Sequence, residues 1–356
     1  MPAGSLGGRT KARVGVLDAR SERDMATEFL RGPGTRLLSV AGYRPRRVVD
    51  NDEICTYIDS SDEWIRARTG IRQRRWADEE ETVTFMGTEA GRVALERAAV
   101  EPHEVAAVIV STVTHLCQTP GAAPLIAAEL GIVGVPAFDV SAACAGFCYC
   151  VGLADSMIRS GAAAGPVLVV ASERLTDISD LHDRSTAFLF ADGAGAVVVG
   201  EGAAGIGPAV WGSDGRRSDV VGQRPYWSAL AAERYDGPWP ALRMAGQELF
   251  RWAIKNMVGL AEEAMKKAGV TAGDLGAFVP HQANGRITEA LAKRLELPDN
   301  VAVAWDVAEA GNTSSASIPL AMDRMIDSGQ AKSGDLALLM GFGSGLVYGA
   351  QVVALP

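Results

Sequence analysis

The sequence predicts an α/β protein made of two similar halves. Apolar stretches such as 167–170 and 336–340 lack the alternation of a half-exposed strand, and segments with helical periodicity separate them. Residues 94–110 also align without a gap on residues 264–280, and each copy has the pattern of a helix end, a turn and a strand. Because continuous apolar strands alternate with helices, we expect sheets that are covered on both faces.

A second internal match lies further along each half. The segment that carries Cys144 and the helix ending at Ser160 correspond to the segment that carries Asn312 and the helix ending at Ser328. An apolar strand and then a Gly-rich turn follow each helix. A duplicated layout places equivalent turns close together across a pseudo-twofold axis, so we expect Cys144 and Asn312 to share one site.

The predicted domain boundaries follow from this repeat. Residues 1–34 are rich in Gly, Arg and Ala, and we expect them to form an N-terminal extension outside the main fold. The first half then spans residues 35–210 and contains the candidate nucleophile. The second half spans residues 211–356 and contains the candidate histidine and asparagine.

Composition excludes several classes of protein. The chain has 356 residues, of which 48% are hydrophobic and 22% charged, with a formal net charge of −9. We find no apolar run of about 18 residues and no secretory signal, so we expect a cytoplasmic protein without a membrane span. The negative charge argues against nucleic-acid binding. The five cysteines lack the spacing of a zinc site, and we expect free thiols, no metal and no cofactor.

Cys144 is the candidate nucleophile. It lies in the stretch 138–147, where a short strand leads into a turn of small residues and then a helix. At a helix N-terminus the unpaired N–H groups and the helix dipole favour the thiolate, which is the nucleophilic form of cysteine. For this residue alone, a buried structural cysteine is an equally good interpretation.

His281 and Asn312 are the other candidates. His281 directly follows an apolar strand, at the sheet edge where open α/β folds hold ligands, although a lone histidine there is more often structural. Together the three residues suit thioester chemistry, in which the cysteine accepts an acyl group and two neutral donors stabilise an oxyanion. The Gly-rich turn 341–345 would place the backbone N–H of Ser344 beside that of Cys144 as an oxyanion hole.

Four motifs together resemble one family. They are 68–72 (RTGIR), 142–147 (AACAGF), 280–284 (PHQAN) and 311–314 (GNTS). In this order they are similar to those of β-ketoacyl-acyl carrier protein synthase III, including the starter-unit ketosynthases of aromatic polyketide pathways. The resemblance covers the chain from about residue 37 onward. It implies a thiolase-like fold, with duplicated halves in α-β-α-β-α layers related by a pseudo-twofold, and a homodimer.

The resemblance also implies a reaction. An acyl group passes from acyl-coenzyme A to Cys144, coenzyme A leaves, and malonyl-acyl carrier protein enters. His281 and Asn312 then hold the thioester oxygen while decarboxylation builds an enolate, and the enolate carbon attacks the acyl-cysteine. An aspartate at position 312 would repel the enolate, so Asn312 favours condensation over the alternative, an acyltransferase that moves the acyl group to an alcohol or amine.

Substrate-binding residues carry over position by position from the family. The implied coenzyme A contacts are Trp64, Arg68, Arg184 and Asn284, with Trp64 and Arg184 enclosing the adenine. The implied basic patch for the acidic carrier protein consists of Arg251, Arg286, Lys293 and Arg294.

Two positions depart from the family pattern. Gly285 stands where a larger residue is usual, which would loosen the start of its helix. Thr119 stands where short-chain members carry Phe at a wall of the acyl pocket that reaches across the dimer. We therefore expect room for a branched or longer starter than acetyl.

Overall fold

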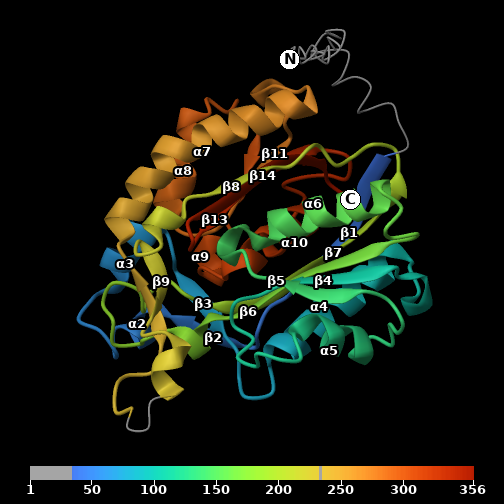
Figure 1. Ribbon diagram of the computed structural model, residues 1–356. Helices are drawn as coiled ribbons and strands as arrows, with labels where there is room; N and C mark the ends of the chain where they lie inside the picture. Colours follow the sequence, from blue (N-terminus) through green and yellow to red (C-terminus); the bar gives the residue numbers. More distant parts are fainter. Residues whose placement is uncertain (1–33, 232–234) are drawn as a thin grey trace, which may run out of the picture.

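Two five-stranded sheets face each other across a central pair of helices (Figure 1). The computed structural model describes residues 34–231 and 235–356. The predicted N-terminal extension therefore lies outside the described residues, except for Gly34, which begins the first strand.

The first sheet has the strand order β1-β7-β6-β4-β5. Strand β4 is parallel to β5 and β6, whereas β7 is antiparallel to β6 and β1. The strands are β1 (Gly34–Tyr43), β4 (Ala107–Ser111), β5 (Ala137–Val140), β6 (Val167–Arg174) and β7 (Asp192–Gly202).

The second sheet repeats this plan with the order β12-β11-β13-β14-β8. Strand β11 is parallel to β12 and β13, and β14 is antiparallel to β13 and β8. The strands are β8 (Val210–Ser213), β11 (Ala277–Pro280), β12 (Ala302–Val303), β13 (Leu336–Gly343) and β14 (Val347–Ala354). The same order and the same directions in both sheets confirm the prediction of two similar α/β halves.

Helices complete the five layers. Helices α6 (Gly146–Arg159) and α10 (Ser317–Asp327) lie between the sheets and contact both (Figure 1). Helices α4 (Val83–Ala98) and α5 (Ala122–Glu129) cover the outer face of the first sheet, and α7 (Gly246–Ala268) packs on the second with α8 (Gly285–Arg294) beside it. The strands between helices are buried almost throughout, as their continuous apolar sequences predict.

Smaller elements lie at one end of the layers, around the site described below. They are two hairpin-like pairs and three short helices: β2 (Arg47–Asp50) with β3 (Gln73–Trp76), β9 (Val221–Arg224) with β10 (Ala241–Met244), α2 (Asn51–Ile54), α3 (Asp62–Thr69) and α9 (Val307–Ala310).

The first internal match is confirmed. Helices α4 and α7 end 170 residues apart, and β4 and β11 begin 170 residues apart. A short 3-10 turn with a capping box separates helix from strand in each copy, at Pro102–Glu104 and Ala272–Asp274.

The second internal match is wrong at the turns. The helix ends correspond as predicted, but the turns before α6 and α10 are the 3-10 segments Ala143–Ala145 and Ser314–Ala316. Ala143 and Ser314 both have a positive φ, of 43° and 51°. The structural counterpart of Cys144 is therefore Ser315 and not Asn312, because α10 is shorter than α6 at its N-terminal end.

The turn that carries Cys144 packs directly on the end of β13. A Cβ added at Gly341 would lie 2.8 Å from the Ala145 Cα and from the Cys144 carbonyl oxygen, and one added at Gly343 would lie 2.8 Å from the Cys144 Cβ. These contacts are with backbone or with the first side-chain atom, so no rotation of a side chain can relieve them. Glycine at both positions allows the second half to set the position of the first half's cysteine.

We expect Gly341→Ala to lower the free energy of unfolding by about 1–3 kcal/mol, because the added methyl overpacks this contact. The control is Gly259→Ala in α7, where a Cβ would meet nothing within 4 Å. Alanine there should stabilise the helix by roughly 0.5–1 kcal/mol. Urea unfolding measures both variants, and equal stability of the two would contradict the close contact at Gly341.

Candidate active site

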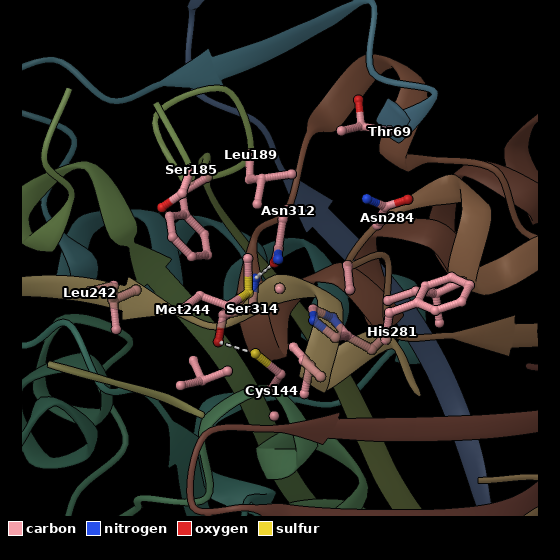
Figure 2. Close-up of a pocket in the computed structure, with 18 of the residues that line it drawn as sticks. Thr69, Cys144, Ser185, Leu189, Leu242, Met244, His281, Asn284, Asn312 and Ser314 are labelled. Carbon is pink, nitrogen blue, oxygen red and sulfur yellow. Dashed lines mark hydrogen bonds between the residues drawn. The ribbon is translucent and has the colours of Figure 1, made fainter. Parts of the chain in front are cut away.

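A cavity of about 690 Å³ opens at the end of the layers where β11 and β13 finish. Its walls are largely apolar and come from both halves of the chain. Cys144, His281 and Asn312, the three predicted catalytic residues, all line it (Figure 2).

Cys144 sits in the 3-10 turn that leads into α6, as expected for a residue at a helix N-terminus. Burial raises the pKa of its thiol to about 12, although hydrogen bonds from the Ser314 hydroxyl and from the cysteine's own N–H act in the opposite direction. Two effects therefore oppose each other at this thiol: burial favours the protonated form, and the hydrogen bonds at the start of α6 favour the thiolate.

His281 follows β11 and is only 3% exposed. Burial lowers the pKa of its imidazole to about 3, so the ring is neutral. Nδ1 lies 2.8 Å from Ser317 Oγ, and that oxygen accepts the backbone N–H of Gln282 at 3.2 Å. The Ser317 hydroxyl hydrogen is then free to bind Nδ1, which leaves the ring proton on Nε2 as a donor for a substrate oxygen.

Asn312 is held by its backbone and its side-chain oxygen. Its N–H donates to Leu189 O, and its carbonyl accepts the N–H of Ala191, both at 2.9 Å. The side-chain Oδ1 accepts the N–H of Ser314 at 2.9 Å. The carboxamide oxygen is thus occupied, and the Nδ2 hydrogens remain as the donors that Asn312 can offer to a ligand.

Ser314 was quoted within a motif, but its role was not predicted. Its hydroxyl donates to Cys144 Sγ at 3.4 Å, so Ser314 is hydrogen-bonded to Asn312 through its backbone and to Cys144 through its side chain (Figure 2). A hydroxyl two residues after the asparagine was a visible signal, but only its positive φ and the fold direct it to the sulfur.

The predicted oxyanion-hole residue Ser344 also lines the cavity, immediately after β13. Its hydroxyl donates to Val221 O at 2.8 Å, which anchors the Gly-rich turn to β9. Gly343, the preceding residue, approaches the Cys144 sulfur so closely that an added Cβ would be 2.9 Å from it.

All four predicted coenzyme A contacts line the same cavity: Trp64, Arg68, Arg184 and Asn284. The guanidinium of Arg68 lies 5.6 Å from the centroid of the Trp64 ring, and Phe188 meets that ring edge-on at 5.3 Å. In the described structure the guanidinium that lies over the Trp64 ring is therefore that of Arg68, whereas the resemblance pairs Trp64 with Arg184. Arg184 is exposed at the rim.

Sequence reasoning missed several apolar residues that line the cavity. They are Val113, Leu175, Leu189, Phe190, Leu242 and Met244. They come from separate loops and strands whose convergence no local pattern reveals. Thr119, the predicted acyl-pocket residue, is exposed in this single chain and is outside the lining of the cavity.

The predicted basic patch is exposed beside the cavity mouth. Arg251 lies on α7, whereas Arg286, Lys293 and Arg294 lie on the neighbouring helix α8. Arg251 and Arg286 also line the cavity, so the patch is continuous with its entrance.

Gly285 does not loosen α8. It is the first residue of the helix, and the side chain of Asn284 caps it by accepting the N–H of Arg286 at 2.9 Å. A Cβ at Gly285 would lie 2.8 Å from the Trp305 ring and 2.9 Å from Thr69 O. Glycine therefore lets the start of α8 pack closely on the end of α3.

The five cysteines at 55, 117, 144, 148 and 150 are free thiols, as predicted, and Cys148 and Cys150 lie in the core. Among the described residues, we find no group of three or more His, Cys, Asp or Glu side chains that could bind a metal ion. No helix in the described part of the chain has the length and apolar character needed to cross a bilayer.

A cysteine, a neutral imidazole and a carboxamide around one cavity, at the joint of two similar α/β halves, define a thiolase-fold condensing enzyme. Comparisons with known proteins specify the class further. Residues 138–215 match the family model of 3-oxoacyl-[acyl-carrier-protein] synthase III, and residues 265–355 match the model of its C-terminal part.

Curated relatives and solved structures agree with these matches. The mycobacterial β-ketoacyl-[acyl-carrier-protein] synthase III of Mycolicibacterium paratuberculosis is 53% identical and aligns over 90% of this chain and 95% of its own. The β-ketoacyl-[acyl-carrier-protein] synthase III of Streptomyces glaucescens is also 53% identical, and it aligns over 91% of this chain and 97% of its own. The crystal structure of a polyketide priming β-ketosynthase superimposes with a TM-score of 0.88 and is 50% identical, covering 92% of this chain and 98% of its own. The structure of the synthase III of Aquifex aeolicus has a TM-score of 0.82 and is 39% identical, covering 90% of this chain and 100% of its own.

The chain therefore belongs to the β-ketoacyl-acyl carrier protein synthase III family. It is a condensing acyltransferase with a thiolase-like fold, and its family implies acyl-coenzyme A and malonyl-acyl carrier protein as substrates.

Because burial lowers the pKa of His281 to about 3, we expect its imidazole to stay neutral from pH 5 to 8. Nitrogen-15 NMR of the labelled histidines measures this directly, with the His281→Gln variant to assign the signal. A titration of that signal with a midpoint between pH 5 and 8 would contradict a neutral hydrogen-bond donor.

Proposed function

We propose that Cys144 carries the acyl group and that His281 and Asn312 stabilise the oxyanion of the malonyl thioester during decarboxylation. The observation that supports this most directly is the hydrogen-bonded chain from Asn312 through Ser314 to Cys144. It fixes the carboxamide relative to the sulfur before any substrate binds, which is the preorganisation that such catalysis needs.

The first half-reaction makes the acyl-enzyme. The Cys144 sulfur attacks the carbonyl carbon of acyl-coenzyme A, and the backbone N–H groups of Cys144 and Ser344 would stabilise the oxyanion that forms. Collapse of this intermediate breaks the bond to coenzyme A and leaves the acyl group on Cys144, and the proton of the Cys144 thiol leaves with coenzyme A as its free thiol.

The second half-reaction forms the carbon–carbon bond. The carbonyl oxygen of the malonyl thioester would accept hydrogen bonds from His281 Nε2 and Asn312 Nδ2. Both donors are neutral and buried, so they stabilise negative charge in an environment that screens it poorly. Loss of carbon dioxide then gives an enolate, whose carbon attacks the acyl-Cys144 carbonyl and releases the β-ketoacyl product on the carrier protein.

We expect Asn312→Asp to separate the two half-reactions. The aspartate can still accept the N–H of Ser314, but its negative charge repels the enolate. Condensation should fall by about 10²–10³, the typical cost of losing one oxyanion donor. Acylation of Cys144 should persist. Intact-protein mass spectrometry measures it, and Cys144→Ala is the negative control. Condensation at an unchanged rate would rule out the proposed role of Asn312.

We propose that coenzyme A enters along the wall formed by Trp64, Arg68, Arg184 and Asn284, and that the carrier protein docks on the basic patch of α7 and α8. Positive side chains beside the entrance attract an acidic partner although the whole chain is negative. Both substrates belong to cytoplasmic metabolism, and we place the enzyme there.

We further propose a homodimer formed through the edge of the first sheet. Strand β5 is an edge strand, and Phe138 on it is 37% exposed. The nearby loop exposes Leu116, which is 47% accessible, and also carries Thr119. An exposed apolar edge of this kind favours pairing with a second copy. In such a dimer Thr119 of each chain would face the acyl pocket of its partner.

A threonine at this wall leaves space for starters larger than acetyl. We expect hexanoyl- or isobutyryl-coenzyme A to acylate Cys144 at least as fast as acetyl-coenzyme A, and we expect Thr119→Phe to shift the preference toward acetyl. Release of coenzyme A over a panel of thioesters measures both. A strong preference of the unaltered chain for acetyl would overturn the assignment of Thr119.

A further inference from the structure

A buried arginine contacts one wall segment of the cavity and has no role in the reaction described so far. Arg74 on β3 is 0% exposed. Within residues 34–231 and 235–356 no Asp or Glu forms an ion pair with it, although a buried cation is usually paired with a carboxylate. Burial lowers the pKa of Arg74 to about 10, so the guanidinium is still charged at neutral pH.

Neutral acceptors hold the guanidinium instead. Nη1 donates to the carbonyl oxygens of Asp50 at 3.0 Å and Val49 at 3.3 Å. Nη2 donates to Asn51 Oδ1 at 2.7 Å and to the carbonyl oxygen of Phe188 at 3.1 Å. Hydrogen bonds from a charged donor are roughly twice as strong as those between neutral groups. The side chain therefore ties the segment that contains Phe188 to the corner between β2 and α2.

That corner is itself fixed to the fold. Asn51 is 1% exposed, and its Nδ2 donates to Asp62 Oδ1 at 2.8 Å and to the carbonyl oxygen of Ile71 at 2.9 Å. These bonds orient the carboxamide so that its Oδ1 accepts from Arg74. The guanidinium thus has a fixed anchor on one side and the Phe188 carbonyl on the other.

The segment 188–191 in turn holds the backbone of Asn312. The carbonyl oxygen of Leu189 accepts the N–H of Asn312, and the N–H of Ala191 donates to the carbonyl oxygen of Asn312, both at 2.9 Å. Phe190 and Asn312 form a parallel β-bridge between these two bonds. The position of this segment therefore determines where the Asn312 backbone lies.

Arg74 also packs against the residue before Asn312. Gly311 has a φ of 68°, and a Cβ added to it would lie 2.9 Å from the Arg74 Cβ and 2.9 Å from the Ala191 Cβ. The stem of Arg74 and the segment 188–191 therefore both pack closely on Gly311. Arg74 restrains the approach to Asn312 twice, once through the Phe188 carbonyl and once through this contact.

We propose that Arg74 is a positioning residue for Asn312 in the condensation step. Its guanidinium fixes the Phe188 carbonyl, and its stem restricts the movement of Gly311. Stabilisation of an oxyanion depends on donors that are held in place before the reaction, so a shift of the Asn312 backbone would weaken the hydrogen bond from Nδ2 to the thioester oxygen. The inference rests on the proposed role of Asn312 as that donor.

We expect Arg74→Met, which removes the donors and keeps an unbranched apolar stem, to affect one half-reaction only. The kcat of condensation with malonyl-acyl carrier protein should fall by roughly 10²-fold, the typical cost of a misplacement of about 1 Å, while KM changes little. Acylation of Cys144 by acyl-coenzyme A should keep its rate, because that step does not use Asn312. Steady-state kinetics and intact-protein mass spectrometry measure the two steps separately.

A double variant separates positioning from a general loss of structure. Asn312→Ala alone should lower the kcat of condensation by about 10²–10³. Arg74→Met should add no further loss in that background, because the group that it positions has been removed. Arg75→Met is the matched control: Arg75 also lies on β3 and donates to two backbone carbonyls, those of Pro45 and Arg46, both at 3.3 Å. It should condense at the unaltered rate.

Three results would overturn the proposal: a folded Arg74→Met that condenses at the unaltered rate, an equal loss of acylation and condensation, or a further full loss in the Asn312→Ala background. If Asn312→Ala itself condenses at the unaltered rate, the proposed function of Asn312 fails and this inference fails with it. Circular dichroism and urea unfolding establish that each variant is folded. If Arg74→Met fails to fold, the same comparisons with Arg74→Lys decide the question, because a single ammonium lacks the fork that spans both sets of acceptors.

Discussion

The close contact between the Cys144 turn and the end of β13 is the constraint on which the rest of the site depends. The cysteine belongs to the first half of the chain, whereas Gly341 and Gly343 belong to the second. Because there is no side chain between them, the halves approach until the sulfur lies among groups of the second half. His281 and Asn312 line the same cavity as Cys144 because the two halves meet here.

Burial at that joint determines the chemical state of the site. Burial raises the pKa of the Cys144 thiol, and it lowers the pKa of the His281 imidazole to about 3, so the imidazole is neutral. A neutral imidazole and a carboxamide can donate to an enolate oxygen over the whole working pH range. The site is therefore well prepared for decarboxylation.

The pseudo-twofold also explains where the supporting groups come from. The turn before α10 corresponds to the turn before α6, but it carries Ser314 and Ser315 where the first half carries Ala143 and Cys144. One copy thus supplies the nucleophile, and the other supplies the Ser314 hydroxyl that donates to it. Duplication followed by this divergence gives one asymmetric active site from two similar turns.

Local patterns in the sequence were sufficient for the α/β class and for the first internal match, and they marked Cys144, His281 and Asn312 as candidates, because strand periodicity and motif residues are properties of neighbouring positions. They misaligned Cys144 with Asn312, since α10 starts later than α6 and an ungapped match cannot show that. The neutral state of His281, the apolar lining of the cavity and the hydrogen bond from Ser314 to Cys144 were decided by the tertiary structure alone. Each depends on segments that are far apart in the chain and come together only in the fold. The pattern of any one segment therefore could not predict them.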